Sequence, residues 1–299
     1  MMQWTTCTVW HSWIELAQER LTFFESDLNA INVFPVADAD TGTNMLRTLA
    51  GAVHPDPQVG INNSLNVSRG NSGTLLALWL KEFVQVMGQH EPWKPATFER
   101  ALKISAQTVE QSLSKPESGT MLTVMEALGE VASKDSLTDY VGELIKVAQI
   151  NTEQTQQTLA QAREAHTVDA GAAGFLLVIV SLGQVLGSQY PRRQSIKQLL
   201  TPGKESRKNF TKSQRFDKGE VEVVCTVQLP IVEITELRSE LDVMGDSLVI
   251  APLKTESTQG TPVWRIHLHV GDAQKVIRLI ENYGEPHNLE IIKLTGEKG

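Results

Sequence analysis

The hydrophobic pattern changes its period once along the chain, and this change constrains the fold more than any other feature. Up to about residue 200, apolar residues recur at helical spacing, and no convincing strand interrupts them. After Glu220, short segments rich in Val, Ile and Thr alternate with two helical segments. A multi-domain chain is therefore predicted, with an all-α domain followed by a small α+β domain.

The first part is expected to contain about eight helices and to span residues 1–202. Ser12 and Glu15 have the spacing of a capping box, and the run from Trp13 to Ile31 is amphipathic. The apolar run 172–182 is shorter than the ~20 residues that span a bilayer, so it predicts a buried helix and no stable membrane insertion. Further helices are predicted at residues 45–52, 75–87, 97–113, 121–132, 137–149, 153–166 and 172–186.

Residues 203–219 form a basic polar stretch between the two parts. A solvated linker is expected there, and a basic patch for an acidic partner is the alternative. Residues 220–299 are expected to form strands at 221–229, 247–251, 263–270 and 289–294, with helices at 235–243 and 273–283. The order β-α-β-β-α-β is that of a ferredoxin-like domain. Because such sheets often pair, a homodimer is expected.

Charge and cysteine content narrow the class of protein. The 299 residues carry a formal net charge of −8, which argues against a nucleic-acid partner, because such proteins are usually basic. Cys7 and Cys225 are the only cysteines, so no disulfide framework is implied. The first residues lack the basic and apolar segments of a signal peptide. A cytoplasmic location is therefore expected.

Two carboxylates, Asp38 and Asp40, stand two residues apart, directly before a helical segment. In an extended segment, residues i and i+2 point the same way, so both side chains can reach one ion. The small residues from Thr41 to Asn44 leave backbone N–H groups at the helix start free to face an anion. This combination indicates Mg²⁺ with a nucleotide phosphate. An ordinary N-cap with a spare acid is the alternative.

Four helical segments begin with loops of small, polar or Gly residues, at 40–44, 69–73, 117–120 and 169–174. In an up-and-down bundle, alternate helices start at the same end, so these loops are expected to converge on one rim. Their combined partial positive charges favour a triphosphate.

The motifs resemble those of the dihydroxyacetone-kinase L-subunit-like domains, and most closely the catalytic subunit of the bacterial fatty acid kinases. Residues 32–36 and 38–45 match the metal-binding signature, and residues 69–73, 118–124 and 168–174 follow in the order of the family. The resemblance covers most of the chain. It implies an eight-helix antiparallel barrel that binds ATP at one end through Mg²⁺.

The resemblance also implies a role for individual residues. Asp38 and Asp40 match the catalytic metal carboxylates, and Asn32 takes the place of a third ligand. Asp169, Ala170 and Gly171 match a loop that closes over the nucleotide. Further nucleotide contacts are implied at Thr41, Thr43, Asn44, Met45, Asn71, Ser72, Gly73, Gly119, Thr120 and Met121.

Two residues depart from the pattern of the family. Ala37 stands where Pro is usual, and Ala39 stands where Gly is usual. If the loop requires a positive φ at Ala39, the Cβ of that residue introduces strain.

The second domain resembles the middle domain of the same kinases, which is expected to bind zinc. His267 and His269 share one face of a strand, and Cys225 lies on another strand. These three residues match a Cys-His-His set for Zn²⁺. Without the resemblance, a buried free Cys and two strand histidines are the simpler interpretation.

The implied reaction is transfer of the γ-phosphoryl group of ATP to a fatty acid carboxylate, which a separate DegV-like acyl-carrying protein presents. A carboxylate is ionised at neutral pH, so the reaction requires no strong base. The full kinases usually have a third, C-terminal domain. A separate third subunit, another carrier-bound substrate or a truncated form is therefore expected here. A non-catalytic nucleotide-sensing or partner-binding protein is one alternative. A glycerone (dihydroxyacetone) kinase-type subunit is another, although the Thr-Gly-Thr-Asn sequence favours the fatty acid branch.

Overall fold

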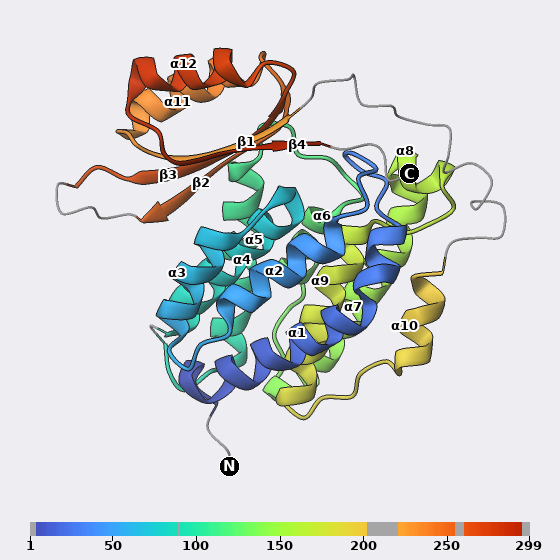
Figure 1. Ribbon diagram of the computed structural model, residues 1–299. Coiled ribbons are helices and arrows are strands. Elements are labelled where there is room, and N and C mark those ends of the chain that lie inside the picture. Colours follow the sequence, from blue (N-terminus) through green and yellow to red (C-terminus); the bar gives the residue numbers. More distant parts are fainter. Residues whose placement is uncertain (1–3, 89, 202–220, 255–259, 295–299) are drawn as a thin grey trace. The chain divides into compact units, whose positions relative to one another are not determined.

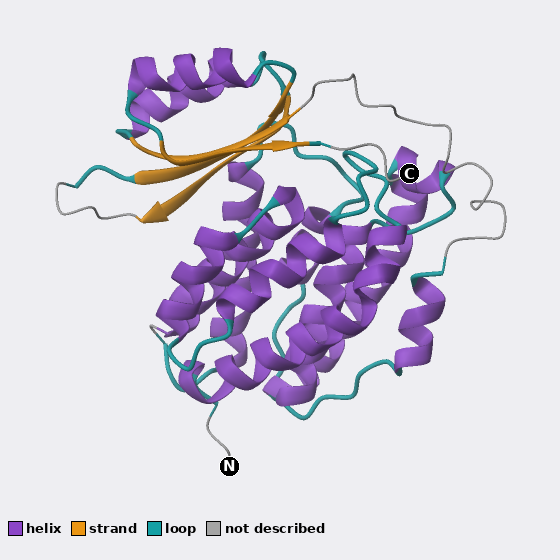
Figure 2. Cartoon of the chain, viewed as in Figure 1, coloured by secondary structure: helices purple, strands orange, loops and turns teal. Residues whose placement is uncertain are grey.

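The computed structural model describes residues 4–88, 90–201, 221–254 and 260–294 (Figure 1). The chain divides into two compact units, the first from residues 1–110 and 117–211 and the second from residues 111–116 and 212–299. The described part of the first unit is helical, whereas the second contains a sheet with two helices (Figure 2). The predicted linker, residues 203–219, lies outside the described residues.

The helices of the first unit confirm the all-α prediction. In the described residues they are α1 (Thr6–Ala30), α2 (Thr41–Ala52), α3 (Pro57–Val67), α4 (Gly70–Gly88), α5 (Pro95–Ser112), α6 (Met121–Gly129), α7 (Leu137–Thr158), α8 (Ala160–Glu164), α9 (Ala170–Val185) and α10 (Arg193–Leu199). The structure establishes a helix-rich unit, and the closed eight-helix barrel stays a prediction.

Helix α9 forms the centre of the first unit. Its residues from Ala170 to Gly183 are all buried, as expected for a helix that is apolar on every side. Helices α1, α2, α6 and α7 pack against it. The prediction of a buried helix at the apolar run 172–182 is confirmed. Among the described residues, no helix is both long and apolar enough to cross a membrane.

An aromatic cluster joins α1, α4 and α9. Trp13 is fully buried and packs edge-on against Trp79 and Phe83, while Trp79 packs edge-on against Phe175. The indole N–H of Trp13 donates to the carbonyl of Val178 at 2.9 Å, so this buried polar group is satisfied. The cluster fixes α1 against the helix that begins at Ala170.

Several helix boundaries differ from the sequence predictions. Helices α2, α4 and α11 begin four or five residues before their predicted starts at 45, 75 and 235, where α11 is the helix Ile231–Leu241. The capping box predicted at Ser12 and Glu15 is wrong, because α1 begins at Thr6 and its capping box pairs Thr5 with Thr8. The two helices predicted at 137–149 and 153–166 are one helix, α7, up to Thr158, followed by the short α8. The helix continues through the gap between the two predicted segments, where the Thr152 hydroxyl donates to the carbonyl of Ala148.

Two helices were not predicted. The N-cap of α3 is Asp56, whose carboxylate accepts the N–H groups of Gln58 and Val59. The sequence of α3 is polar and contains Gly60, which weakens the helical signal. Helix α10 has only seven residues and buries Ile196 alone.

The second unit contains β1 (Val221–Gln228), α11 (Ile231–Leu241), β2 (Asp246–Lys254), β3 (Val263–Val270), α12 (Ala273–Tyr283) and β4 (His287–Lys293). The predicted order β-α-β-β-α-β is confirmed. The strands form an antiparallel sheet in the order β2-β3-β1-β4. The segment 111–116 belongs to this unit, because Leu113 bridges Val249 and the Ser114 N–H donates to Leu248.

The sheet of the second unit has two chemically different faces. Alternate residues of β1 and β3, including Val223, Cys225 and Leu268, form an apolar core with α11 and α12. Glu222 of β1 and His267 of β3 alternate with these apolar residues along their strands. Because successive strand residues point to opposite sides, the side chains of Glu222 and His267 lie on the other face.

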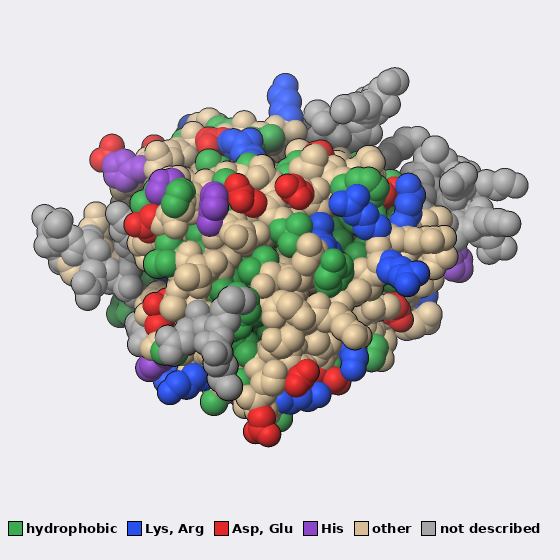
Figure 3. Space-filling model, turned by 90° about the horizontal axis from the view of Figure 1, so that it is seen from below, with side chains coloured by type: hydrophobic (Ala, Val, Ile, Leu, Met, Phe, Trp, Pro, Cys, Tyr) green, Lys and Arg blue, Asp and Glu red, His purple; other side chains and the backbone are tan. Residues whose placement is uncertain are grey.

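One face of the molecule carries charged side chains of both signs (Figure 3). On the face seen in Figure 3, Lys and Arg side chains are interspersed with Asp and Glu side chains. In the described residues this face therefore has no extended field of one sign, although the net charge of the chain is −8.

Candidate functional site

The loop before α2 brings three oxygen-bearing side chains together. The amide of Asn32, which is 5% exposed, donates to Asp38 Oδ1 at 2.5 Å. The Oδ1 atom of Asn32 is buried without a hydrogen-bond partner. Burial raises the pKa of Asp38 to about 8, and the charge of Asp40 and the hydrogen bond with it act in the same direction. The cluster therefore has an unsatisfied oxygen beside two crowded carboxyl groups.

This geometry fits a hard cation. Carboxylate and amide oxygens are ligands that Mg²⁺ accepts, and a cation there would satisfy Asn32 Oδ1 and offset the repulsion between Asp38 and Asp40. The described residues contain no group of three or more His, Cys, Asp or Glu that could hold a metal ion. Proteins usually hold Mg²⁺ through one or two carboxylates, with water and phosphate oxygens as its other ligands, so a site of this kind needs no third carboxylate.

Mg²⁺-dependent nucleotide binding is expected to weaken about tenfold for each pH unit below 8, because Asp38 must lose a proton before it can ligate a cation. Below its raised pKa, the Asp38 carboxyl holds that proton in the metal-free protein. Titrations in buffers of different ionisation enthalpy at pH 7 should detect the released proton. The Asp38→Asn variant should lose this pH dependence, whereas a wild-type affinity that is flat from pH 6 to 8 would contradict the assignment.

Ala39 adopts the backbone conformation in which a Cβ is unfavourable. Its φ is +57°, in the left-handed region. A residue with a Cβ loses roughly 1–2 kcal/mol there, so the loop between the two carboxylates contains strain that Gly would remove.

Replacing Ala39 with Gly is expected to stabilise the protein by about 0.5–1 kcal/mol, after subtraction of the entropy that Gly loses on folding. Ala37 is exposed and is not among the described residues with positive φ, so it provides the matched control. Ala37→Gly should destabilise by a similar amount. Urea unfolding measures both changes, and equal signs for the two variants would refute the strain argument.

Asp169 connects the starts of two helices. Its carboxylate caps α9 by accepting the Ala172 N–H at 2.7 Å, and it also accepts the N–H of Met121 at the start of α6. Burial raises the pKa of Asp169 to about 6, although these N–H groups and that of Gly171 lower it. The N-termini of α6 and α9 therefore lie side by side.

The start of α4 adjoins the same place. A Cβ built on Gly171 would lie 3.1 Å from Ser72 Oγ and 3.4 Å from Met121 Cβ. Gly70 has a φ of +58°, and a Cβ there would lie 2.5 Å from Asn44 Nδ2 of α2. Four helix starts, those of α2, α4, α6 and α9, thus meet through these neighbours, as the loop pattern suggested.

The other predicted nucleotide residues differ in their surroundings. Met45 is fully buried, and its sulfur packs against Gly174, so it belongs to the core. Thr120 is the N-cap of α6, yet its hydroxyl donates to the carbonyl of Glu117. The Oδ1 atom of Asn71 is buried without a hydrogen-bond partner. The remaining predicted residues have these positions: Thr41 and Gly73 are buried at the starts of α2 and α4, the Gly119 N–H donates to Thr123, and Ala170 is buried at the start of α9.

Two site residues were missed by the sequence analysis. Glu25 and Asn29 of α1 bond to Thr43 at the start of α2. They lie four residues apart and therefore share a helix face, but on an amphipathic helix such a polar face is usually only solvated.

The predicted zinc set is wrong. Cys225 pairs with Ile266 across the sheet and therefore shares its face, in the apolar core. His267 pairs with Val224, and His269 with Glu222, on the opposite face. A register one residue different would have joined the three side chains. Among the described residues, no group suited to a metal ion appears here.

The surroundings of Cys225, His267 and His269 also differ from those of zinc ligands. Burial raises the pKa of the Cys225 thiol to about 12 and lowers the pKa of His269 to about 4. His267 is 2.8 Å from Glu222 Oε1, so a carboxylate lies beside this imidazole in place of the thiolate.

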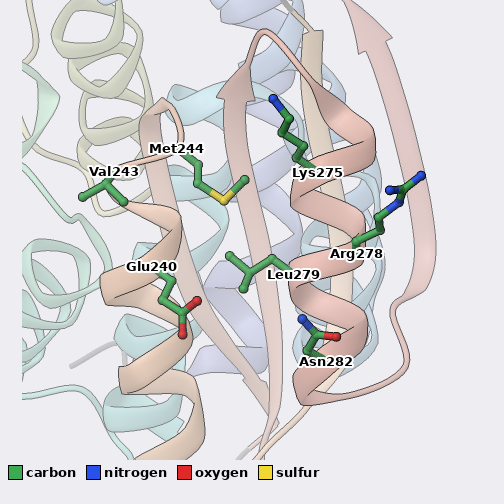
Figure 4. A pocket seen from close by; sticks show the side chains of 7 residues that line it. All are labelled: Glu240, Val243, Met244, Lys275, Arg278, Leu279 and Asn282. Carbon is green, nitrogen blue, oxygen red and sulfur yellow. The ribbon is translucent and has the colours of Figure 1, made fainter.

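A separate hollow of about 450 Å³ lies in the second unit (Figure 4). Its lining side chains come from α11, the turn after it, and α12, as Glu240, Met244 and Leu279 illustrate. None of the predicted site residues lines this hollow.

Comparisons with known proteins agree with the resemblance. The DAK2 domain family matches residues 35–184, and the family of FakA-like middle domains of fatty acid kinase matches residues 220–298. The first match contains Asp38, Asp40 and the four helix starts.

Several curated proteins are similar over most of this chain. Protein YloV of Bacillus subtilis is 24% identical over 290 residues, which cover 89% of this chain and 51% of YloV. An uncharacterized protein of Mycoplasma genitalium is 26% identical over 302 residues, which cover 89% and 52%. An uncharacterized protein of Staphylococcus saprophyticus is 23% identical over 288 residues, which cover 88% and 50%.

The chain spans about half the length of the curated relatives it matches. The matched families account for both the helical unit and the unit with the sheet. The chain belongs to the DAK2 domain family and continues into a FakA-like middle domain of the fatty acid kinase type.

Proposed function

We propose that this chain is an ATP-dependent phosphotransferase that phosphorylates the carboxylate of a fatty acid. The substrate is presented by a separate acyl-carrying protein of the DegV-like type. The observation that carries the proposal is the cluster of Asn32, Asp38 and Asp40 at the start of α2, beside three further helix starts. The match to a fatty acid kinase middle domain supports the choice of acceptor.

The helix starts are suited to hold the phosphates. The first N–H groups of a helix lack partners within it and carry partial positive charge, so converging N-termini bind a polyanion. Asp169 accepts backbone N–H groups at the starts of both α6 and α9, which keeps the two N-termini together. Asn44 of α2 packs against Gly70 of α4.

The cation site fits Mg²⁺, which Asn32, Asp38 and Asp40 would hold. When bound, Mg²⁺ neutralises phosphate charge and orients the γ-phosphoryl group. Above its raised pKa, the Asp38 carboxyl is ionised and could ligate such a cation.

The reaction requires positioning more than acid–base chemistry. An oxygen of the fatty acid carboxylate forms a bond to the γ-phosphorus, the bond to the β–γ bridging oxygen breaks, and ADP leaves with that electron pair. Because the acceptor is already ionised, no proton is abstracted. A reaction without proton abstraction agrees with a site that is built, in its described residues, from carboxylates and the N-termini of helices.

Trapping of the product tests the proposal. The protein, Mg-ATP and a DegV-like protein loaded with a fatty acid should form ADP, and hydroxylamine should convert the acyl-phosphate into an acyl hydroxamate in equal amount. The Asp38→Ala variant should form neither product. Dihydroxyacetone offered with its own binding subunit gives a phosphate ester that hydroxylamine does not trap, so this assay separates the two kinase types.

A non-catalytic nucleotide sensor is the second candidate, and the left-handed Ala39 is the observation that favours it. Backbone strain at Ala39, between the two carboxylates, weakens the cation site. Phosphoryl transfer depends on that site, whereas ATP can still bind through the helix N-termini, so the strain reduces transfer more than it reduces ATP binding. ATP binding without any hydroxamate, even after Ala39→Gly, would replace the first proposal with this one.

A further inference from the structure

The N-terminus of α2 has an unusual cap. Asp40 stands at the N-cap position, but its side chain makes no capping hydrogen bond. An Asp in this place usually accepts the N–H of the second or third helical residue. Here the Asp40 carboxyl is instead hydrogen-bonded with Asp38.

Another helix supplies the missing acceptor. Thr43 is the third residue of α2, and its N–H donates to Asn29 Oδ1 of α1 at 3.2 Å. The Asn29 amide also donates to Thr43 Oγ1 at 2.9 Å, and that hydroxyl donates to Glu25 Oε1 at 2.7 Å. The amide of Asn29 therefore holds both the backbone and the side chain of Thr43.

Close packing of the two helices makes this contact possible. A Cβ on Gly42 would lie 2.6 Å from the carbonyl oxygen of Glu25 and 2.9 Å from Asn29 Oδ1. Gly42 thus lets α1 approach the first turn of α2. The Thr-Gly-Thr sequence after Asp40 suits this contact. Gly42 lets the two helices approach closely, and Thr43 forms the hydrogen bonds with Asn29.

We propose that Asn29 is a positioning residue that caps α2 in place of Asp40 and so leaves the Asp40 carboxylate facing Asp38 and the cation. The second half of this inference rests on the proposed function, because the Asp40 carboxylate acts on a cation only if the site binds one. Without Asn29, Asp40 rotates to cap Thr43, as an N-cap Asp ordinarily does.

Thermal unfolding of the ligand-free protein tests the capping half. In the wild-type background, Asp40→Ala should lower the melting midpoint by less than about 1 °C. It removes no capping hydrogen bond, and the lost hydrogen bond with Asp38 is offset by the lost repulsion between the two carboxyl groups. In the Asn29→Ala background the same substitution should lower it by roughly 2–4 °C, since Asp40 is then the cap. Equal shifts in the two backgrounds would overturn the inference. Asn63→Ala, at an exposed position of α3, is the matched control and should leave the effect of Asp40→Ala unchanged.

Calorimetric titration with ATP tests the second half. Asn29→Ala should weaken binding about tenfold with Mg²⁺ present and leave it unchanged in EDTA, by analogy with partners that orient metal ligands. In the Asp40→Ala background, Asn29→Ala should have no further effect on affinity. An equal loss with and without Mg²⁺ would mean that Asn29 serves the fold alone and would overturn this half.

The two measurements separate failure of this inference from failure of the proposed function. If wild-type protein shows no Mg²⁺-dependent ATP binding, the proposed function and the role of Asp40 toward a cation fail together. The unfolding cycle needs no ligand, so it still decides whether Asn29 or Asp40 caps α2.

Discussion

Replacing Asp38 with Asn is expected to weaken Mg²⁺-dependent ATP binding by at least about 100-fold. Loss of outer-shell partners already costs about 10- to 100-fold in metal affinity, and Asp38 is assigned as a direct ligand. Asn keeps the shape of the side chain and can still bond to Asn32, so the change removes charge with little change in packing. Isothermal titration with ATP and Mg²⁺ measures the effect.

The same variant has a second expected result in the metal-free protein. Since folding raises the pKa of Asp38, the folded state binds the extra proton, and stability falls as pH rises from about 4 through about 8. Asp38→Asn should therefore unfold at a higher temperature than wild type at pH 8.5. Asp135→Asn removes the same charge at an exposed position and should alter neither binding nor stability. A stable variant that keeps wild-type Mg²⁺ dependence would exclude Asp38 as a ligand.

Replacing Trp13 with Ala is expected to lower the free energy of unfolding of the helical unit by about 3–5 kcal/mol, the usual cost of removing a buried aromatic side chain. Trp13 is fully buried, packs against Trp79 and Phe83, and donates to Val178. The substitution therefore leaves a cavity and removes this hydrogen bond between α1 and α9.

Urea denaturation measures this loss, with two comparisons. Ile150 is 51% exposed on α7, so Ile150→Ala should change the free energy of unfolding by less than about 0.5 kcal/mol. Trp13→Phe restores aromatic volume but not the hydrogen bond, and should lie between wild type and Trp13→Ala. A loss below about 1 kcal/mol for Trp13→Ala would show that the cluster does not hold α1 against α9.

Hydrophobic periodicity predicted much of the fold, because several helices and strands have a regular pattern of apolar residues. The strand at Val263–Val270 and the helix at Ala273–Tyr283 were predicted with the observed bounds, and Gly284 directly after the helix is a usual C-terminal signal. The start of α1 was misplaced because its cap pairs two Thr residues rather than Ser with Glu. The local sequence pattern gives little information on which of two neighbouring capping residues begins a helix.

The candidate site was predictable where its residues are adjacent in the chain. Asp38, Asp40 and the four helix starts come from local motifs, and the structure brings them together. The zinc set failed because strand register decides which face Cys225 occupies, and register is set by tertiary pairing. Asn29 was missed for a related reason, since only the packing of α1 on α2 gives it a partner.

The most direct test of the central claim is calorimetric titration of ATP into the wild-type protein with and without Mg²⁺, alongside the Asp38→Ala/Asp40→Ala variant. A magnesium–nucleotide site at the start of α2 predicts saturable binding that requires Mg²⁺ and is lost in the variant. Binding that is unchanged in EDTA and in the variant, or no binding by the wild-type protein at all, would contradict it.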